Sequence, residues 1–339
     1  MKKLQFSLYY VFFSILQSQN IFADVLEVSP KFESQNIGTY INYMIDGSLS
    51  ISYEDAKKNA ANGAYIRSLS DSKGFGVGRN SLWMFFDVRS MDNNVSKLYL
   101  ISQIPLYEAI LYYEQNGKII EKKSGFKHPH TEWDISHNRV VFNLDLPSEG
   151  ETRRFFIRIE TDGVLAFDWI MANFNQTNLL ITHGKFMLGA FLGLIVIMIF
   201  YNLFLFFSVR EISYLYYIMY LLFFFMLTFG IDGLSLQYLW PESVEWNLRS
   251  FTFFAALSSI FSTLFARSFL KLPKISKKIN WFSIFLVILF SIHWVLCIFI
   301  SIDANNERGN ILGAVQLLSL VFFGVYSLAK GQKQARFFS

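Results

Sequence analysis

The sequence predicts a multi-domain membrane protein: an all-β jelly-roll or sandwich domain outside the cytoplasm, followed by an α-helical transmembrane bundle. Three observations lead to this prediction. The second half contains five long apolar runs without charge, the first half contains short runs rich in aromatic and β-branched residues, and basic residues gather between the apolar runs. Because the composition shifts near Asn178, we expect a β domain over residues 24–178 and a membrane domain over residues 179–339.

The first 23 residues have the order of a secretory signal peptide. A basic start at residues 1–3 precedes an apolar run over residues 4–16 and a polar stretch that ends at Ala23, a small residue at the expected cleavage position. An uncleaved anchor helix is the alternative, but the apolar run is shorter than the ~20 residues that span a bilayer. Either interpretation places the residues from Asp24 onward outside the cytoplasm.

The β domain is predicted from short strands of alternating character. In residues 154–160 every second side chain is Phe or Ile, as a strand with one buried face requires. Asn116-Gly117 between two such runs is a strong hairpin signal, and Tyr53–Asn62 is the one short helix expected before the first long strand. The predicted strands are residues 81–88, 97–102, 109–114, 118–121, 140–146, 154–159 and 164–170. Evenly spaced short strands are typical of an antiparallel sandwich or jelly roll.

Each apolar run is long enough to cross a bilayer. The hydrocarbon core is about 30 Å thick, and a helix that rises about 1.5 Å per residue needs ~20 residues to span it. Backbone groups in lipid must bond within their own segment, so each run is expected to be helical. The predicted spans are about 186–208, 212–231, 250–267, 280–302 and 309–329. The chain then ends in Arg-Phe-Phe-Ser at residues 336–339, which resembles the start of another span and suggests a truncated product or a fragment.

The basic residues predict the orientation in the membrane. With the β domain outside, the outer connections contain only two basic residues, Arg249 and Arg308. The segments predicted to be cytoplasmic contain Arg210, Arg267, Lys271, Lys274, Lys277, Lys278, Lys330, Lys333 and Arg336. Cytoplasmic loops of membrane proteins carry such an excess of Lys and Arg. We therefore predict a multi-pass protein of the inner (cytoplasmic) membrane with a periplasmic, extracytoplasmic N-terminal domain.

Composition excludes several other classes of protein. Residues 24–185 contain 17 Lys and Arg against 20 Asp and Glu, so the exported part has no basic surplus for nucleic acid. The single cysteine, Cys297, allows no disulfide within the chain and no cysteine metal site. No serine nucleophile elbow, zinc-protease helix, kinase signature or cyclase signature occurs, so we expect no enzymatic activity and no cofactor.

Two segments of the β domain contain residue types that bind ligands in other proteins. The glycines of residues 74–78 resemble a phosphate loop, but a strand follows them where a helix is needed, so a glycine-rich connection is the better interpretation. His128, His130 and His137 lie near Glu132 and Asp134, without the spacing of a metal site, and we interpret this segment as a solvated loop. Trp133 in the same loop is a weak candidate for ligand contact, either stacking on a sugar ring or packing under the sheet.

Polar and small residues within the spans predict how the helices associate. Asn202 is expected to hold helices together and His293 to lie in the core or at the interface, because polar groups in lipid face the bundle interior. Gly189 and Gly193 form a small-xxx-small step that would allow another helix to approach closely. The aromatic residues Tyr214, Tyr217, Trp240 and Trp246 fit interfacial belts.

Several segments resemble a known family, the bacterial seven-transmembrane receptors with diverse intracellular signalling modules. The best match is residues 189–220, where the first span ends in Tyr201-Asn202 and is followed by Arg210. Weaker matches are Gly230-Ile231-Asp232-Gly233 with Gln237-Tyr238-Leu239 and Pro241, Arg267-Ser268-Phe269-Leu270, and residues 331–336. In the exported half, Trp83-Met84-Phe85-Phe86 and Phe156-Ile157-Arg158-Ile159 resemble two core strands of the family's second type of extracellular domain.

The resemblance implies a sensor whose jelly-roll domain binds a small molecule, such as a carbohydrate, and acts on a helical bundle in the lipid bilayer. Family members normally have two more spans and a cytoplasmic module, often a histidine kinase or a diguanylate cyclase, so a cytoplasmic signalling partner is expected. The alternative is a membrane-anchored assembly factor whose outer domain binds a protein. Transport is disfavoured because no predicted span has a charged residue in its interior.

Overall fold

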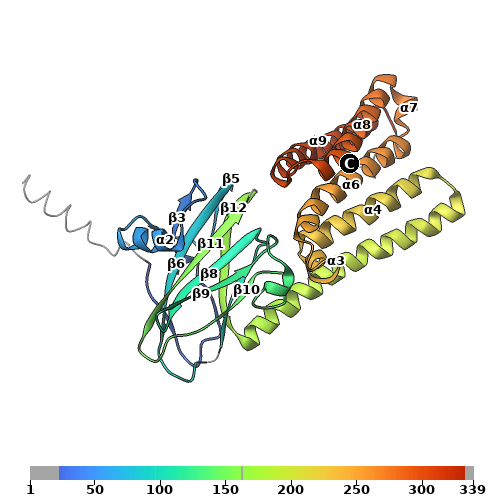
Figure 1. The fold of residues 1–339 in the computed structure, drawn as a ribbon. Helices are drawn as coiled ribbons and strands as arrows, with labels where there is room; N and C mark the ends of the chain where they lie inside the picture. Colours follow the sequence, from blue (N-terminus) through green and yellow to red (C-terminus); the bar gives the residue numbers. More distant parts are fainter. Residues whose placement is uncertain (1–22, 96, 162, 333–339) are drawn as a thin grey trace, which may run out of the picture. The chain divides into compact units, whose positions relative to one another are not determined.

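The computed structural model describes residues 23–95, 97–161 and 163–332 (Figure 1). The predicted signal peptide, except for Ala23, and the start of a further span predicted at residues 336–339 lie outside these residues. The chain divides into two compact units. We call them the β unit (residues up to 125, 133–135 and 139–178) and the helical unit (residues 126–132, 136–138 and 179 onward).

The β unit contains two sheets in the described residues, and most neighbouring strands are antiparallel. Sheet A has the order β4-β3-β6-β11-β8-β9, and β1 pairs in parallel with the end of β6. Its strands are β1 (Leu26–Val28), β3 (Asn42–Asp46), β4 (Ile66–Arg67), β6 (Asn80–Ser90), β8 (Glu108–Gln115), β9 (Lys118–Ser124) and β11 (Thr152–Thr161). Sheet B has the order β10-β7-β12-β2, and β5 also pairs with β12. Its strands are β2 (Ser34–Asn36), β5 (Ser72–Val77), β7 (Leu98–Ser102), β10 (Val141–Leu144) and β12 (Val164–Asn173).

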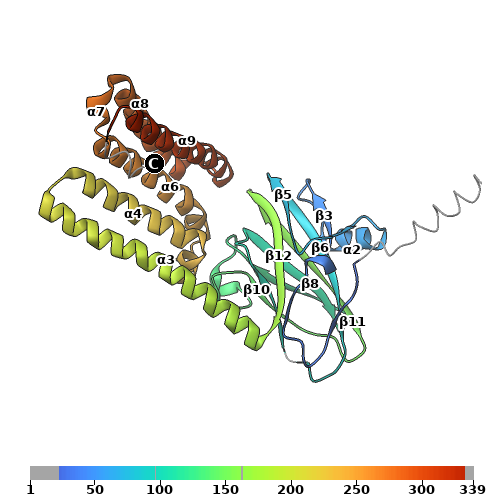
Figure 2. The ribbon, with the colours of Figure 1, turned by 180° about the vertical axis from the view of Figure 1, so that it is seen from behind.

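One hydrophobic core lies between the two sheets, as in a sandwich. Leu82, Met84 and Phe86 of β6 contribute to it from sheet A, and Phe142 of β10 and Trp169 of β12 contribute from sheet B. All five side chains are essentially inaccessible to solvent. Figure 2 shows the strands of this unit from behind. The all-β prediction is confirmed, and its description as a jelly roll stays a prediction.

All seven predicted strands are present, with bounds that differ by a few residues. The predicted hairpin joins β8 to β9 through Asn116 and Gly117, which have φ of 51° and 71°. Positive φ at both central residues is the requirement of the tight turn that Asn-Gly favours. The predicted helix is α2 (Tyr53–Ala61), and the hydroxyl of its N-cap Ser52 accepts a hydrogen bond from the Asp55 amide.

Five strands at the start of the chain were not predicted, namely β1 to β5. They are between two and six residues long, and β2 (Ser34–Asn36) contains no aromatic or β-branched residue. The sequence predicted that residues 74–78 form a glycine-rich connection, and the structure corrects this prediction. Residues 72–77 form strand β5, which pairs with β12 in an irregular register. Gly76 in this strand has φ of 95°, a conformation that favours glycine.

The helical unit contains, in its described residues, five helices that are long and apolar enough to cross a membrane. They are α3 (Phe174–Val209), α4 (Ile212–Ile231), α6 (Val244–Phe269), α8 (Lys277–Phe299) and α9 (Ile302–Ala329), with short helices α5 (Leu234–Tyr238) and α7 (Leu272–Ile275) between them. Several helices begin before the predicted spans, and α3 begins twelve residues before residue 186. The helix therefore includes polar residues that the search for apolar runs left out.

Packing inside the helical unit is both apolar and polar. Helices α3 and α4 lie side by side (Figure 2), with Leu192 and Ile195 packed near Leu221. Between α6 and α9 the Gln316 amide group donates to the Ser262 hydroxyl at 2.8 Å and accepts from the Thr263 hydroxyl at 3.1 Å. Such bonds satisfy polar groups that lipid cannot.

The polar and small residues singled out in the spans have different surroundings. His293 is buried, as expected for a core histidine. The Asn202 side chain donates to the Met198 carbonyl of its own helix, so this bond does not join two helices. A Cβ added at Gly189 or Gly193 would meet no described atom within 4 Å, so the predicted close approach of another helix is absent among the described residues.

Candidate ligand site on the outer face of sheet A

Sheet A has a second covered face, on the side away from the core between the sheets. We call it the outer face. Along β11, Phe155, Ile157 and Ile159 belong to the inner core, so the alternating residues Phe156, Arg158 and Glu160 lie on the outer face. The same alternation applies on the neighbouring strands. The residues in register with Arg158 and Glu160 therefore form rows across this face.

Two rows carry most of the polar groups. Glu160 lies between Ser81 of β6 and Glu108 of β8, and Ser81 in turn pairs with Asp46 of β3. In the next row, Arg158 lies between Trp83 and Ile110. The first row thus contains three carboxylates, on β3, β11 and β8, and the hydroxyl of Ser81 on β6. Arg158 lies in the next row, two residues before Glu160 on the same strand.

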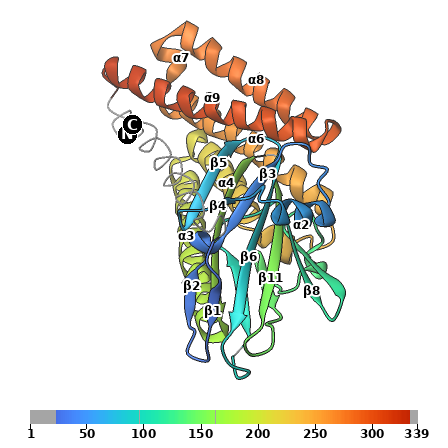
Figure 3. The same cartoon turned by 90° about the vertical axis from the view of Figure 1, so that its left-hand side faces the viewer.

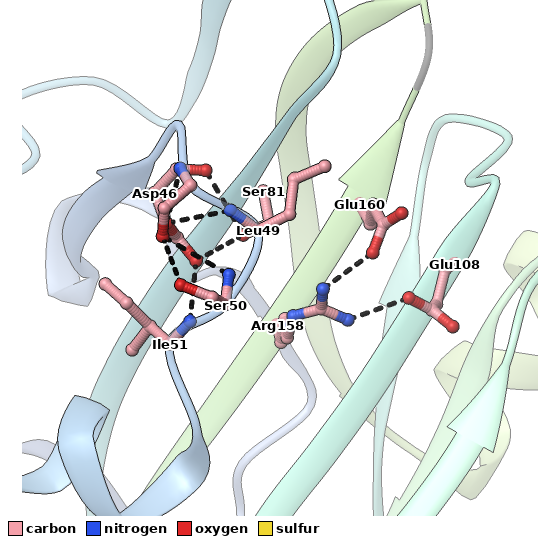
Figure 4. A network of polar contacts seen from close by, with 9 residues as sticks. Asp46, Leu49, Ser50, Ile51, Ser81, Glu108, Arg158 and Glu160 are labelled. Atoms are coloured by element: carbon pink, nitrogen blue, oxygen red, sulfur yellow. Dashed lines mark hydrogen bonds and ion pairs between the residues drawn. The ribbon is translucent and has the colours of Figure 1, made fainter. Parts of the chain in front are cut away.

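Arg158 joins the two glutamates of the first row (Figure 4). Its Nη1 donates to Glu108 Oε2 at 2.8 Å and its Nη2 donates to Glu160 Oε2 at 2.6 Å. The side chains are 14%, 7% and 8% exposed for Arg158, Glu108 and Glu160. Charges removed from water in this way are stable only when they are paired and hydrogen-bonded. Two carboxylates share one guanidinium, so this group of three side chains has a formal charge of −1.

Asp46 ends β3 and organises the turn that follows it (Figure 4). Its carboxylate accepts hydrogen bonds from the amides of Ser48, Leu49 and Ile51 and from the hydroxyl of Ser81. Burial raises the pKa of Asp46, but these hydrogen bonds together outweigh burial and hold the pKa below its ordinary value. The turn therefore contains an ionised carboxylate at neutral pH and leads the chain onto the outer face.

Helix α2 and Tyr65, which follows it, cover part of the outer face. The buried side chains of Ala56, Ala60 and Tyr65 pack there with Trp83, Phe85 and Phe156 in a second hydrophobic cluster. Figure 3 shows α2 beside the strands of sheet A. Burial of both faces explains why β6 is apolar at every position from Leu82 to Phe86, where a strand with one solvent-exposed face would alternate.

Three aromatic rings are stacked at this cluster. The ring centroids of Trp83 and Tyr112 are 5.7 Å apart with an interplanar angle of 25°, and those of Tyr112 and Tyr53 are 5.0 Å apart at 20°. Tyr53 and Tyr112 are only half-buried. Burial, and secondarily the charge of Glu114, raises the pKa of Tyr53 to about 12, so its phenol stays protonated at neutral pH. The stack runs from the buried Trp83 to the edge of the helix.

Two donors buried beneath α2 have no hydrogen-bond partner among the described residues. They are the indole Nε1 of Trp83 and the phenol oxygen of Tyr65. The residues are 1% and 2% exposed. Buried polar groups are nearly always satisfied by protein, water or a ligand, so these two donors are the polar groups on this face whose pairing needs an explanation. The outer face therefore combines aromatic rings, unused donors, a guanidinium and carboxylates.

The ligand candidates from the sequence lie elsewhere. Trp133 is buried, at 7% exposed, in the segment between β9 and β10, which is not part of the outer face. Its contact with a ligand stays a prediction. Among the described residues, no group of three or more His, Cys, Asp and Glu side chains is arranged to hold a metal ion.

The sequence predicted that the histidine segment is a solvated loop. This prediction is wrong for two of its histidines, whereas Glu132 and Asp134 are exposed. His130 and His137 are both 6% exposed. Both belong to the helical unit, where the His130 amide donates to the Pro241 carbonyl at 2.8 Å and the ring Nε2 of His130 lies 3.0 Å from the His137 carbonyl. Residue types alone did not indicate these backbone partners, and Pro241 is more than a hundred residues away in the sequence.

The outer-face residues were visible in the sequence but were not recognised as a site. The alternation in residues 154–160 already placed Arg158 and Glu160 on one face of a strand. Trp83 and Arg158 also lay in the segments that resembled the known family. Glu108 was missed because the predicted strand began one residue later, at Ala109, and its pairing with β11 joins residues about fifty positions apart.

Comparisons with known proteins assign the chain to a family. A model for the second extracellular domain type of 7TMR-DISM proteins matches residues 38–172, and a model for the 7TM region of diverse intracellular signalling matches residues 184–339. A comparison with curated proteins gives no match. The two matches follow each other in the order of the β unit and the helical unit, and they bear out the resemblance seen in the sequence. The chain belongs to the 7TMR-DISM family, whose domains indicate a membrane signalling receptor with an N-terminal extracellular domain.

Proposed function

We propose that the chain is the sensory part of a receptor in the inner membrane and that its β unit binds a small polar ligand in the periplasm. The binding site is the outer face of sheet A at the edge of α2. Ligand binding changes the arrangement of the helical unit, which a cytoplasmic signalling partner detects. The family membership supports the receptor role, and the side chains of the outer face support the position of the site.

The observation that carries the proposal is the set of polar groups buried on this face. Trp83 and Tyr65 each have a donor without a described partner, and Arg158 holds two carboxylates close by. A structural surface would place apolar side chains here, because unpaired buried donors cost ~1–3 kcal/mol each. A bound molecule that accepts hydrogen bonds would remove this cost.

The chemistry of the face suits a polyhydroxy compound such as a carbohydrate. Hydroxyl groups both donate and accept, so they match the carboxylates of Glu108 and Glu160 and the indole N–H of Trp83. Tyr53 ends the aromatic stack and is half-buried, so we propose that its ring meets the C–H groups of a sugar ring. We name carbohydrates as the first class to test, because the face offers both kinds of contact.

A ligand can act on the helical unit only through a difference in affinity between two arrangements of the protein. Helix α2 covers the site, so a ligand beneath its edge would change how tightly α2 packs on Phe85 and Phe156. The last strand, β12, is followed directly by α3 at Phe174, without an intervening loop. A change in the β unit therefore has a continuous path of regular structure into the first span.

The test uses the full chain in lipid nanodiscs and a library of sugars, amino acids and nucleosides. We expect at least one sugar to raise the thermal stability of the wild type and the Trp83→Phe variant to lose this effect. Trp169→Phe is the matched control, because the indole N–H of Trp169 also lacks a described partner but lies in the inner core. Equal loss in both variants, or no response to any compound, would count against the site. A co-purifying protein in place of a small ligand would support the alternative role as an assembly factor.

A further inference from the structure

The segment between β9 and β10 belongs in part to the helical unit, although both strands lie in the β unit. Residues 126–132 and 136–138 group with the helices, whereas the residues up to Gly125 group with the strands. The chain therefore passes from the β unit to the helical unit at Phe126, well before the connection from β12 to α3. The β9–β10 segment is thus a second covalent link between the two units.

Gly125 joins the start of this link to the proposed sensory site. It has φ of 106°, and a Cβ at this position would lie 2.8 Å from the Tyr107 carbonyl oxygen and 2.9 Å from the Glu108 Cα. A side chain here would force these backbone atoms to move. The Glu108 carboxylate accepts a hydrogen bond from Arg158 at 2.8 Å (Figure 4). Glu108 therefore connects the charged group of the outer face with the start of the link.

Phe126 anchors the link within the helical unit. It is 8% exposed, and its ring meets the ring of Phe251 on α6 edge-on, with centroids 5.5 Å apart. Gly233, just before α5, has φ of 81°, and a Cβ there would lie 3.2 Å from Phe126 Cε1 and 2.4 Å from the Asn138 carbonyl oxygen. The Asn138 side chain donates to the Asp232 carbonyl at 3.0 Å. The link is thus packed closely on the connection between α4 and α6.

Close packing at both ends of the link allows a displacement at one end to reach the other, because packed protein atoms have low compressibility and transmit strain. We propose that Phe126 is a positioning residue that couples the sensory site to α5 and the start of α6. A change at Glu108 moves Gly125, and Phe126 passes this change to Gly233 and Phe251. The inference rests on the proposed function for the role of the site, but the coupling itself needs no ligand.

Hydrogen–deuterium exchange of the full chain in lipid nanodiscs tests the coupling without a ligand. Glu108→Ala removes one partner of Arg158, and we expect it to speed exchange in α5 and the start of α6 by about twofold or more. Glu114→Ala is the control on the same strand, because it removes the partner of Lys57 far from Gly125 in the sequence. It should leave exchange in α5 unchanged. Peptides from β12 report whether the β unit is folded, and Glu108→Gln gives the same comparison with Glu114→Gln if the alanine variant is not.

A double variant separates coupling from local loosening. Phe126→Ala alone should speed exchange in α5, because it removes contacts there. Glu108→Ala should then add no further increase, since two changes on one path are not additive. Equal increases from Glu108→Ala with and without Phe126, or no effect of Glu108→Ala on α5, would overturn the proposal. The sugar screen tests the proposed function separately, because exchange is measured here without any sugar.

Coupling between two sites is reciprocal, so a change in the helical unit should also reach the site. Gly233→Ala should speed exchange in β8 near Glu108. Gly331→Ala is the matched control, because Gly331 has a similar φ of 79° and a Cβ there would meet no described atom within 4 Å. Equal exchange in β8 for the two glycine variants would contradict the proposed path.

Discussion

The Arg158→Met variant gives a quantitative test of the charged group on the outer face. Methionine keeps the apolar stem of the side chain but removes the guanidinium, so Glu108 and Glu160 remain as two buried carboxylates in register with each other. Both are less than a tenth exposed, so water can replace little of the interaction with the guanidinium. We expect the β unit to be strongly destabilised.

The magnitude follows from the two hydrogen bonds. Each bond to a charged group contributes about 1.5–3 kcal/mol, so loss of both costs ~3–6 kcal/mol. Removal of one partner from a buried ion pair gives a similar range, about 3–5 kcal/mol. A triple variant with Glu108→Gln and Glu160→Gln added to Arg158→Met carries no charge in this group, and it should recover most of the lost stability.

Urea unfolding of the full chain in detergent, followed by near-UV circular dichroism, measures this effect. For a slope of about 2 kcal/mol/M, the unfolding midpoint of the β unit should fall by ~1.5–3 M. The control is Lys57→Met, which breaks the pair with Glu114. Both side chains of that pair are nearly half exposed, so its loss should cost ~1 kcal/mol or less. If Arg158→Met cost no more than Lys57→Met, the buried charges would not be coupled as described.

Three further predictions concern other parts of the chain. Gly38→Ala should destabilise the β unit by ~3 kcal/mol in the same assay, because a Cβ at this position would lie 2.0 Å from the Asp71 carbonyl oxygen. Burial raises the pKa of Tyr53 and of Tyr112 to about 12, with smaller effects of neighbouring glutamates. The two protonated phenols therefore contribute fully to the stability of the β unit below pH 10, and this contribution is lost as the pH rises through 12. Tyrosinate absorbance should show the ionisation, and urea unfolding should show the loss of stability. Gln316→Leu should destabilise the helical unit by ~1–2 kcal/mol in thermal unfolding, because it removes hydrogen bonds within the membrane.

Each of these predictions has a control or a contradicting result. Gly74→Ala, also in the β unit, places a Cβ where no described atom lies within 4 Å, so it should be nearly neutral. Tyrosine ionisation that is complete below pH 11 would contradict the burial of Tyr53 and Tyr112. Leu317→Ala, at an exposed position beside Gln316, should change stability less than Gln316→Leu.

The helical unit was the part most accessible to prediction from sequence. A lipid environment allows few structures, so length and the absence of charge were enough to place five helices. Their ends were less predictable, because polar residues such as those of residues 174–185 continue α3 beyond the apolar run. Helix packing was the least predictable: Gly189 and Gly193 fit a packing motif, yet a Cβ added at either would meet no described atom of another helix within 4 Å.

In the β unit, local signals were read correctly and distant pairings were not. Asn116-Gly117 fixes its turn through its own backbone preferences, so the hairpin was predictable. The short strand β1 is stabilised by parallel pairing with the end of β6, sixty residues away, and nothing local marks it. The same reason explains the candidate site: Arg158 was expected on one face of a strand, but its partner Glu108 is determined by strand register.

The proposed function depends on the β unit lying outside the cytoplasm. Reporter fusions after Glu242 and after Ser276 test this topology most directly, because two described spans precede the first point and three precede the second. A reporter that is active only outside the cytoplasm should work after Glu242 and be silent after Ser276. Activity at both positions, or silence at both, would contradict the receptor topology.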